Sequence, residues 1–327
     1  MSKAEKARQI VKEFPHTSKK ELGKILHQRN PILFKDAEDA RYTIRTVTGA
    51  AKGNDRVTQT KAYKGPLSIP RGEINDFSPY VVKGSNVGII CDIHLPYHDF
   101  DALEIAIKEL KRQKIDTLIL NGDIIDCYHA SDYEKDPNKR NLPGEIAMLC
   151  HFLSDLQKSF PKVKIIYKLG NHEERFERYI LKKAPALWGF ECFELDNLIK
   201  IEYLRLMGKP LDIDFVKGKR IIRIGKLAVI HGHEFREGSF SPVNPARGYF
   251  IRSFASVIGG DKHRTSEHTE PDINGKLFGA WSIGCLCDLH PLYMPLNKWN
   301  LGFSRVIKYE DESFEVKNQK IIGGKIA

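Results

Sequence analysis

Five short polar clusters in this 327-residue chain contain the residue types that bind divalent metal ions, and each directly follows an apolar run typical of a buried strand. Proteins of the α/β class build their sites at the carboxyl ends of such strands. Because carboxylates, imidazoles and carboxamides are metal ligands, clusters converging from five strand ends indicate a site for one or two divalent ions. The clusters are Asp92-Ile-His94, Asn121-Gly-Asp123 with Asp126, Gly170-Asn-His-Glu173, His231-Gly-His233 and Gly259-Gly-Asp261-Lys-His263.

The elements that must position these clusters alternate between strands and helices. Strands are predicted at residues 87–91, 115–120 and 163–168, and helices at about 100–113 and 144–160. Beyond residue 200 the predicted strands come closer together. This pattern is typical of α/β layering, and we assign residues 84–327 to one catalytic domain.

The first 50 residues have a different pattern, which predicts three short helices at 2–14, 19–28 and about 36–47. Ser18 with Glu21 is a capping-box signature that opens the second of them. Residues 51–83 are rich in Gly, Pro, Ser and Thr and are predicted to be a linker. The expected organisation is therefore a helical module at 1–50, a linker at 51–83 and the larger domain at 84–327.

The positive charge of the chain is concentrated at its start. The whole chain has a net charge of +10, but residues 1–71 contain sixteen Lys and Arg against seven Asp and Glu, and the remainder holds 36 against 35. Such an excess favours a polyanionic partner for this segment, for which nucleic acid is the natural candidate. The three helices form either a helix-turn-helix that contacts nucleic acid through Arg41 and Arg45, or a solvated basic cap on the next domain.

The composition excludes several other classes of protein. No apolar run approaches the ~20 residues that a membrane span needs, and the basic first ten residues are not followed by the apolar stretch of a secretory leader. The six cysteines are scattered and do not form the framework of a disulfide-rich domain. We expect a cytoplasmic protein with no membrane partner.

Taken together, the five clusters resemble the motifs of the calcineurin-like metallophosphoesterase superfamily. Its blocks Asp-x-His, Gly-Asp-x-x-Asp, Gly-Asn-His-Glu, a His after a strand, and Gly-His-x-His match residues 92–94, 122–126, 170–173, 231 and 260–263. The resemblance covers about residues 85–310 and is to relatives of bacterial or phage type. It implies a four-layer α-β-β-α sandwich, which the small helical domain precedes.

The resemblance also implies a role for each matching residue. One metal ion would be held by Asp92, His94 and His263, and Asp123 would bridge to a second ion held by Asn171 and His231. The imidazole of His172, oriented by Asp126, would protonate the leaving oxygen or stabilise the transferring phosphoryl group. A hydroxide bridging two metal ions 3.5 to 4 Å apart, roughly the spacing of two-metal sites, would attack phosphorus.

One position departs from the family pattern, because Asp261 stands where the last block usually has its first histidine. The resemblance implies two divalent ions. Because an aspartate oxygen would favour a harder ion, Mn²⁺ is favoured over Fe or Zn²⁺. The alternative is that Asp261 points away and the second metal site is weak or empty.

The substrate is less determined than the reaction class. Leu169 stands where Ser/Thr protein phosphatases have an arginine before Gly-Asn-His-Glu, and the basic first segment favours a phosphodiesterase or nuclease that acts on nucleic acid. Two alternatives stay open. The first is a small-substrate or protein phosphatase with an incidental basic N-terminus. The second is a non-catalytic nucleic-acid-binding protein in which Asp261 marks a decaying site.

Overall fold

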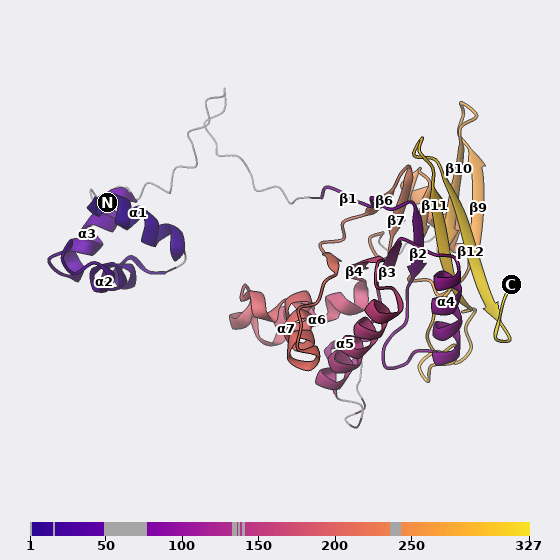
Figure 1. Ribbon diagram of the computed structural model, residues 1–327, viewed down its shortest axis with the longest axis horizontal. Coiled ribbons are helices and arrows are strands. Elements are labelled where there is room, and N and C mark those ends of the chain that lie inside the picture. Colours follow the sequence, from indigo (N-terminus) through magenta and orange to yellow (C-terminus); the bar gives the residue numbers. More distant parts are fainter. Residues whose placement is uncertain are drawn as a thin grey trace. The chain divides into compact units, whose positions relative to one another are not determined.

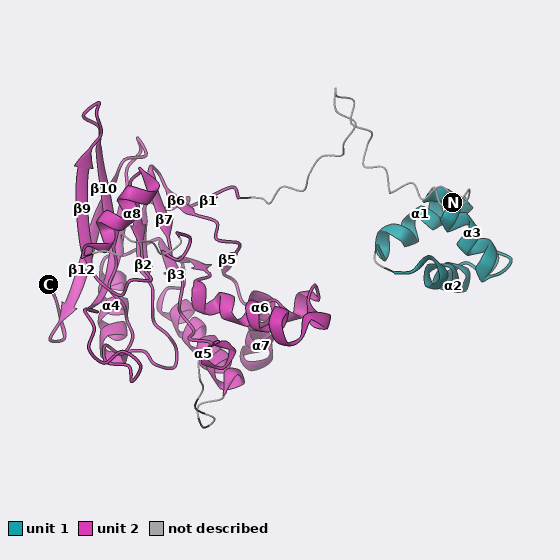
Figure 2. Ribbon diagram, turned by 180° about the vertical axis from the view of Figure 1, so that it is seen from behind, with its two compact units in different colours: residues 1–75 teal, residues 76–327 magenta. Residues whose placement is uncertain are grey.

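The computed structural model describes residues 2–15, 17–48, 77–132, 136, 138, 141–235 and 243–327. These residues belong to two compact units, residues 1–75 and 76–327, each drawn in its own colour in Figure 2. Each unit has its own apolar core, so we describe them separately. Among the described residues, no helix is both long and apolar enough to cross a membrane.

The first unit contains the three predicted helices, α1 (Lys3–Glu13), α2 (Lys19–Arg29) and α3 (Ala37–Val47). Ser2, Ser18 and Asp36 cap their N-termini through side-chain oxygens that accept backbone N–H groups. The helices enclose a small core to which each contributes and to which the α2–α3 connection adds Phe34. The prediction of a small N-terminal helical domain is confirmed.

The connections in this unit are longer than those of a typical helix-turn-helix. Five residues (14–18) join α1 to α2 and seven (30–36) join α2 to α3, whereas the motif uses a turn of about 3–4 residues. The helix-turn-helix interpretation therefore stays a prediction. Residues 51–76 of the predicted linker (51–83) lie outside the described residues, and its last part, residues 77–83, contains a strand. Tyr80–Val81 form a strand, β1, because their backbone groups pair with Ile222 and Arg223 of the second unit.

The second unit is built on two sheets (Figure 1). One has the order β13-β12-β11-β2-β3-β4-β5, with β2, β3, β4 and β5 parallel. Its strands are Lys325–Ile326, Phe314–Ile322, Leu301–Lys308, Asn86–Ile90, Thr117–Asn121, Lys164–Lys168 and Asp214–Val216.

The other sheet has the order β1-β6-β7-β8-β10-β9, in which β8 is parallel to both β7 and β10. After β1, its strands in this order are Ile222–Ile224, Leu227–Ile230, Val257–Gly259, Leu277–Ser282 and Ser266–Pro271.

Side chains alternate between layers along the central strands, as period-two geometry requires. Ile119 of β3 packs between the two sheets, whereas Leu118 and Leu120 face the helices. In the same way, Val229 of β7 lies between the sheets and Ala228 and Ile230 lie on the outer face. The two sheets therefore share one apolar layer and each has a second one outside it.

Helices cover both outer faces. Four of them pack on the seven-stranded sheet: α4 (Phe100–Arg112), α5 (Leu142–Ser159), α6 (Asn171–Lys183) and α7 (Leu195–Met207). On the six-stranded sheet lies α8 (Pro245–Ser253), through Ala246 and Tyr249. Short 3₁₀ turns occur at Tyr128–Ala130, Pro185–Leu187 and Glu191–Phe193. The predicted four-layer α-β-β-α sandwich is confirmed.

Candidate active site

The five polar clusters of the sequence meet at one place. They follow the carboxyl ends of β2, β3 and β4 in one sheet and of β7 and β8 in the other, so both sheets supply side chains. Eight ionisable side chains of these clusters are at least nine-tenths buried: Asp92, His94, Asp123, Asp126, His172, Glu173, His231 and His263. Buried charges at this density require partners or metal ions.

The backbone at this edge is held in an uncommon conformation. Five of the predicted ligands have φ between 52° and 63°, a region that costs non-glycine residues of order 1–3 kcal/mol each. Backbone hydrogen bonds between neighbouring loops hold this shape. The Asp92 N–H donates to the Gly122 carbonyl, and the His94 N–H donates to the Asp123 carbonyl. The five residues are Asp92, His94, Asp123, Asp261 and His263.

The first candidate metal group joins β2 to β8. His94 Nε2 lies 3.1 Å from His263 Nε2, which in turn lies 3.2 Å from Asp92 Oδ1. Since the Asp126 carboxylate accepts from His94 Nδ1 at 3.1 Å, a neutral His94 ring has only a lone pair at Nε2. Ligand atoms about 2.1 Å from one cation lie about 3.0–3.4 Å apart. Acceptors facing one another at these distances fit a bound cation.

The second candidate group joins β4 to β7. His231 Nδ1 donates to the Asn121 carbonyl at 2.7 Å, so a neutral His231 ring presents a lone pair at Nε2. That atom lies 3.0 Å from Asn171 Oδ1 and 3.3 Å from Asp123 Oδ2. Turning the Asn171 amide over would let its nitrogen donate to His231 Nε2, Asp261 Oδ1 and Asp123 Oδ2. The oxygen-inward orientation is instead the one that suits a cation among these atoms.

Asp123 lies between the two groups. Its Oδ2 is 3.3 Å from His231 Nε2, 3.9 Å from His94 Nε2 and 3.7 Å from His172 Nε2. Its other oxygen, Oδ1, accepts the backbone N–H of His172 at 2.9 Å. One carboxylate therefore reaches both groups while the start of α6 fixes its orientation.

Asp261 directs one oxygen to the second group. Its Oδ1 lies 3.9 Å from His231 Nε2, and its Oδ2 forms an ion pair with Lys262 at 2.8 Å. The Asp261 N–H also donates to both oxygens of Asp92 at 3.1 Å. The side chain therefore lies with the other predicted ligands, and it is tied to a lysine on its far oxygen.

His172 lies in the first turn of α6 and not in a loop after β4. Its Nδ1 is 2.9 Å from both the carbonyl oxygen and Oδ1 of Asp126, and its Nε2 is 2.8 Å from Nη2 of Arg175. Burial alone would lower the pKa of His172, but the charge of Asp123 and the hydrogen bond to Asp126 outweigh it and raise that pKa. A proton therefore binds this imidazole more firmly than an exposed one.

Glu173 supports the site in a way that the sequence did not predict, although it belongs to the Gly-Asn-His-Glu motif. It is fully buried, accepts the N–H groups of Gly170, Asp123 and Ile124 at 2.7–2.9 Å, and accepts from the Tyr167 hydroxyl at 2.7 Å. One carboxylate thus joins the loops after β3 and β4. Its position in a first helical turn was the available signal.

A second missed support lies behind His231. Glu234 accepts the N–H groups of His231 and Gly232 at 2.9 and 2.7 Å and pairs with the fully buried Lys168 at 2.9 Å. Burial would raise the pKa of Glu234, but Lys168 lowers it to about 2. Because Lys168 is far away in sequence, no local pattern could reveal this pair.

Arg41 and Arg45, predicted to contact nucleic acid, both lie on α3 in the first unit. Arg41 Nη1 pairs with Glu38 at 3.1 Å, and its side chain is 34% exposed. Arg45 is also partly exposed. Their predicted role stays a prediction.

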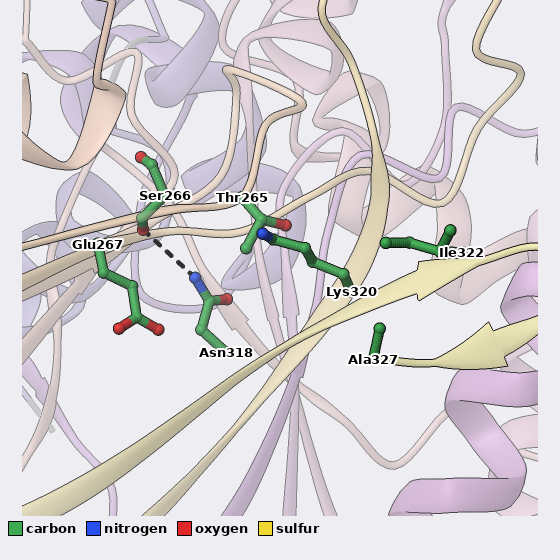
Figure 3. Close-up of a pocket in the computed structure, with 7 residues that line it drawn as sticks. All are labelled: Thr265, Ser266, Glu267, Asn318, Lys320, Ile322 and Ala327. Carbon is green, nitrogen blue, oxygen red and sulfur yellow. Dashed lines mark hydrogen bonds between the residues drawn. The ribbon is translucent and has the colours of Figure 1, made fainter.

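A separate pocket of about 460 Å³ lies between β9 and β12 (Figure 3). Its lining includes one carboxylate, Glu267, and one ammonium group, Lys320, but no histidine. Asn318 Nδ2 donates to the Ser266 carbonyl across it at 3.4 Å. This lining lacks the ligand set found at the strand ends.

Comparison with known proteins identifies the matching family. The family model for calcineurin-like phosphoesterases matches residues 85–270. No curated protein matches the chain. Among solved structures, vacuolar protein sorting 29 from Cryptosporidium parvum is similar at 14% identity and a TM-score of 0.39, covering 75% of this chain and 95% of that one. The phosphoesterase Yfce from E. coli (13%, TM-score 0.35, 71% and 98%) and the Pseudomonas putida nuclease MPE (13%, 0.31, 68% and 84%) are also similar.

Proposed function

We propose that this chain, which belongs to the calcineurin-like phosphoesterase family, is a metal-dependent phosphodiesterase that hydrolyses nucleic acid. The observation that carries the phosphoesterase part is the set of buried acceptors that face one another across the two sheets. The nucleic-acid part rests on the charge of residues 1–71.

The ligand assignment follows from the two groups. Two divalent ions would neutralise phosphoryl oxygens and lower the pKa of a bound water. Asp123 would be shared between them, and the oxygen-rich second group, with Asn171 and Asp261, favours Mn²⁺ over Zn²⁺. The first ion would be held by Asp92, His94 and His263, and the second by Asn171, His231 and Asp261.

His172 is the proposed proton donor. Asp126 holds its Nδ1, so Nε2 is the atom that would carry the proton to the leaving oxygen. Arg175 now occupies that direction, with Nη2 at 2.8 Å from Nε2. A phosphoryl oxygen in the site would draw this guanidinium to itself and free Nε2 for the transfer.

The proposed substrate follows from where the charge lies. The first 71 residues carry a net charge of +9, and the remainder, including the site, carries only +1. A polymer with many phosphates gains from such a segment by releasing counterions, whereas a small ester in the site does not. We therefore assign binding of the strand to the basic segment and cutting to the two-sheet unit.

The test compares three substrates with metal-depleted protein to which Mn²⁺ is restored. We expect hydrolysis of bis(p-nitrophenyl) phosphate and of a single-stranded oligonucleotide, and weak hydrolysis of the monoester p-nitrophenyl phosphate. Hydrolysis of the monoester alone would contradict the proposal. Hydrolysis without added metal, in the presence of a chelator, would contradict the metal assignment.

A small-substrate or protein phosphatase is the alternative that one observation favours. Several cations of the first unit are already paired, Lys3 with Asp39, Arg29 with Glu13 and Arg41 with Glu38. These pairs reduce the charge free to meet phosphates. A non-catalytic binding protein is disfavoured, because every predicted ligand lies in or beside the two groups and His172 lies next to the shared Asp123.

A further inference from the structure

A loop beside the site exposes large apolar side chains. This segment, which we call the rim loop, comprises residues 288–300 between β10 and β11. Leu292 is 88% exposed, Tyr293 74% and Leu296 95%, and Met294 is also exposed. Large apolar side chains that gather in one exposed stretch are candidates for a contact surface.

Both ends of the rim loop are attached to the site. The Asp288 N–H donates to the Tyr97 carbonyl at 2.8 Å, and the Asn300 N–H donates to the carbonyl of the predicted ligand His263 at 2.9 Å. The Trp299 ring lies edge-on to the His263 ring at 4.2 Å, and Tyr293 is 6.4 Å from Trp299. A row of rings thus leads outward from the candidate metal centre.

The loop is braced from within. Asn297 Nδ2 donates to the carbonyls of Leu289 and Met294 at 2.7 and 2.8 Å, and His290 Nδ1 contacts the Pro295 carbonyl at 3.0 Å. The Trp299 N–H donates to Asn297 Oδ1 at 2.9 Å. These hydrogen bonds give the loop a defined conformation in which its apolar side chains are exposed to water. A ligand would therefore bind without the entropy cost of ordering the loop.

The charges of the site act on the outer ring. The negative charge of Asp126 raises the pKa of Tyr293 above its ordinary value, and the charge of Arg175 acts in the opposite direction. Tyr97, whose ring packs 6.4 Å from that of Tyr128, has its pKa raised to about 12 by burial and the same Asp126. Aromatic rings from two separate segments of the chain therefore lie close enough to Asp126, the partner of His172, for its charge to affect them.

We propose that Tyr293 and Trp299 form a stacking platform for a nucleobase next to the scissile phosphate, so that the substrate is a single strand. The inference rests on the proposed function. Aromatic side chains beside a phosphate site bind single strands because every base offers a flat face, and such stacking tolerates any sequence. In a duplex the bases are stacked on one another and closed to this platform.

A protein partner is the other occupant that an apolar loop could take. The nucleobase is favoured because Trp299 contacts a predicted metal ligand, so whatever covers the row of rings must extend toward the phosphoryl position. A base-bearing phosphodiester combines a flat ring and an anionic group in one molecule.

The experiment measures binding to a normal single strand and to strands in which one nucleotide is abasic. The abasic position lies directly on the 5′ side or directly on the 3′ side of a central phosphate. Dissociation constants are measured by fluorescence anisotropy at fixed salt with Mn²⁺, in a His172→Ala background that slows cleavage. The variants are Tyr293→Leu, which removes the ring, and Tyr293→Phe, which keeps it. Trp188→Leu removes another exposed aromatic ring, 52% exposed, and is the matched control.

We expect the parent protein, Tyr293→Phe and Trp188→Leu to bind the normal strand about tenfold more tightly than the abasic one, a typical effect of one stacked base. Tyr293→Leu should bring this ratio close to one. Equal binding of the two strands by the parent protein would overturn the platform, as would an unchanged ratio in Tyr293→Leu or tighter binding of duplex than of single strand. Failure of the proposed function looks different, because then wild-type protein would hydrolyse small esters and cut no strand at all.

Discussion

Three neighbouring side chains fix the position of His172 and the hydrogen bonding of its ring. Asp126 holds Nδ1, Asp123 accepts the backbone N–H, and Arg175 lies at Nε2. The ligands of the two candidate metal groups face one another without His172, so its imidazole is not needed to hold a metal ion. Catalysis and metal binding should therefore be separable at this residue.

Replacing His172 with Ala should lower kcat on the small diester by a factor of about 10²–10⁴, the usual contribution of a general acid. The metal content per chain, measured by elemental mass spectrometry, should stay as in wild type. His268→Ala, which removes a histidine paired with Glu270 on β9, is the control and should leave both unchanged. Normal turnover in His172→Ala would refute its assignment as proton donor.

Glu145 provides a pH-dependent prediction. This carboxyl group is 4% exposed, its Oε2 has no hydrogen-bond partner among the described residues, and burial together with Asp126 raises its pKa to about 7. The folded chain keeps this proton up to about pH 7, whereas the unfolded chain releases it near the ordinary value of 4.5. The wild type therefore loses stability as the pH rises between these values.

Glu145→Gln removes that titration, so it should gain about 1–3 kcal/mol in free energy of unfolding relative to wild type between pH 5 and pH 8. Urea denaturation at the two pH values measures the difference. Glu104→Gln, at an exposed position on α4, should show no such change. The same relative stability of Glu145→Gln at both pH values would show that this group does not hold a proton when folded.

At the scale of elements, the close approach of α2 to α3 depends on Gly23. A Cβ atom added there would lie 2.8 Å from the Ala37 carbonyl oxygen and 2.8 Å from Arg41 Cβ. Gly23→Ala gains up to about 1 kcal/mol of helix propensity, but the overpacking costs about 1–3 kcal/mol because a backbone oxygen cannot easily move.

We therefore expect Gly23→Ala to destabilise the first unit by up to about 2 kcal/mol and to leave the second unit unchanged. Hydrogen exchange followed by peptide mass spectrometry reports on the two units separately. Lys20→Ala, on the exposed side of α2, is the control. Increased protection of α2 and α3 in Gly23→Ala would contradict the close packing.

The elements also show what the sequence could predict and why the rest escaped it. Strands such as β3 and β7 were predictable because they are buried on both faces and consist of continuous apolar residues. The β9 strand was not, since Ser266–Pro271 is polar and lies at a sheet edge. The α6 helix was not among the predicted elements, although its acidic first turn (Glu173, Glu174) and basic last turn (Lys182, Lys183) follow the charge order of a helix.

The candidate site shows the same division. Its ligands could be predicted because each follows a strand, and strand ends meet. Lys168 beneath Glu234 and Trp299 beside His263 are non-local contacts, for which one sequence carries no pattern. The sequence allows two positions for Asp261, toward the other ligands or away from them, and the fold places its Oδ1 3.9 Å from His231 Nε2.

At the scale of the whole molecule, the charge distribution makes a prediction for α3. Replacing Arg41 and Arg45 together with Ala should weaken binding of duplex DNA and reduce the slope of log K against log salt by up to about 2, since each phosphate contact contributes about 0.9. Titrations at several salt concentrations measure the slope. Arg112→Ala with Arg205→Ala is the matched control, since each of these arginines, like Arg41, pairs with a glutamate three residues earlier. Unchanged affinity in the α3 variant would refute its contact with nucleic acid.

The most direct measurement compares the full chain with a chain of residues 76–327, which keeps both sheets and their cores. Both are given Mn²⁺ and offered single-stranded DNA, duplex DNA, RNA and bis(p-nitrophenyl) phosphate. We expect equal hydrolysis of the small diester by both chains, and efficient cutting of polymer by the full chain alone, with the single strand preferred. Equal rates on small esters with no cutting of any polymer by either chain would contradict this expectation.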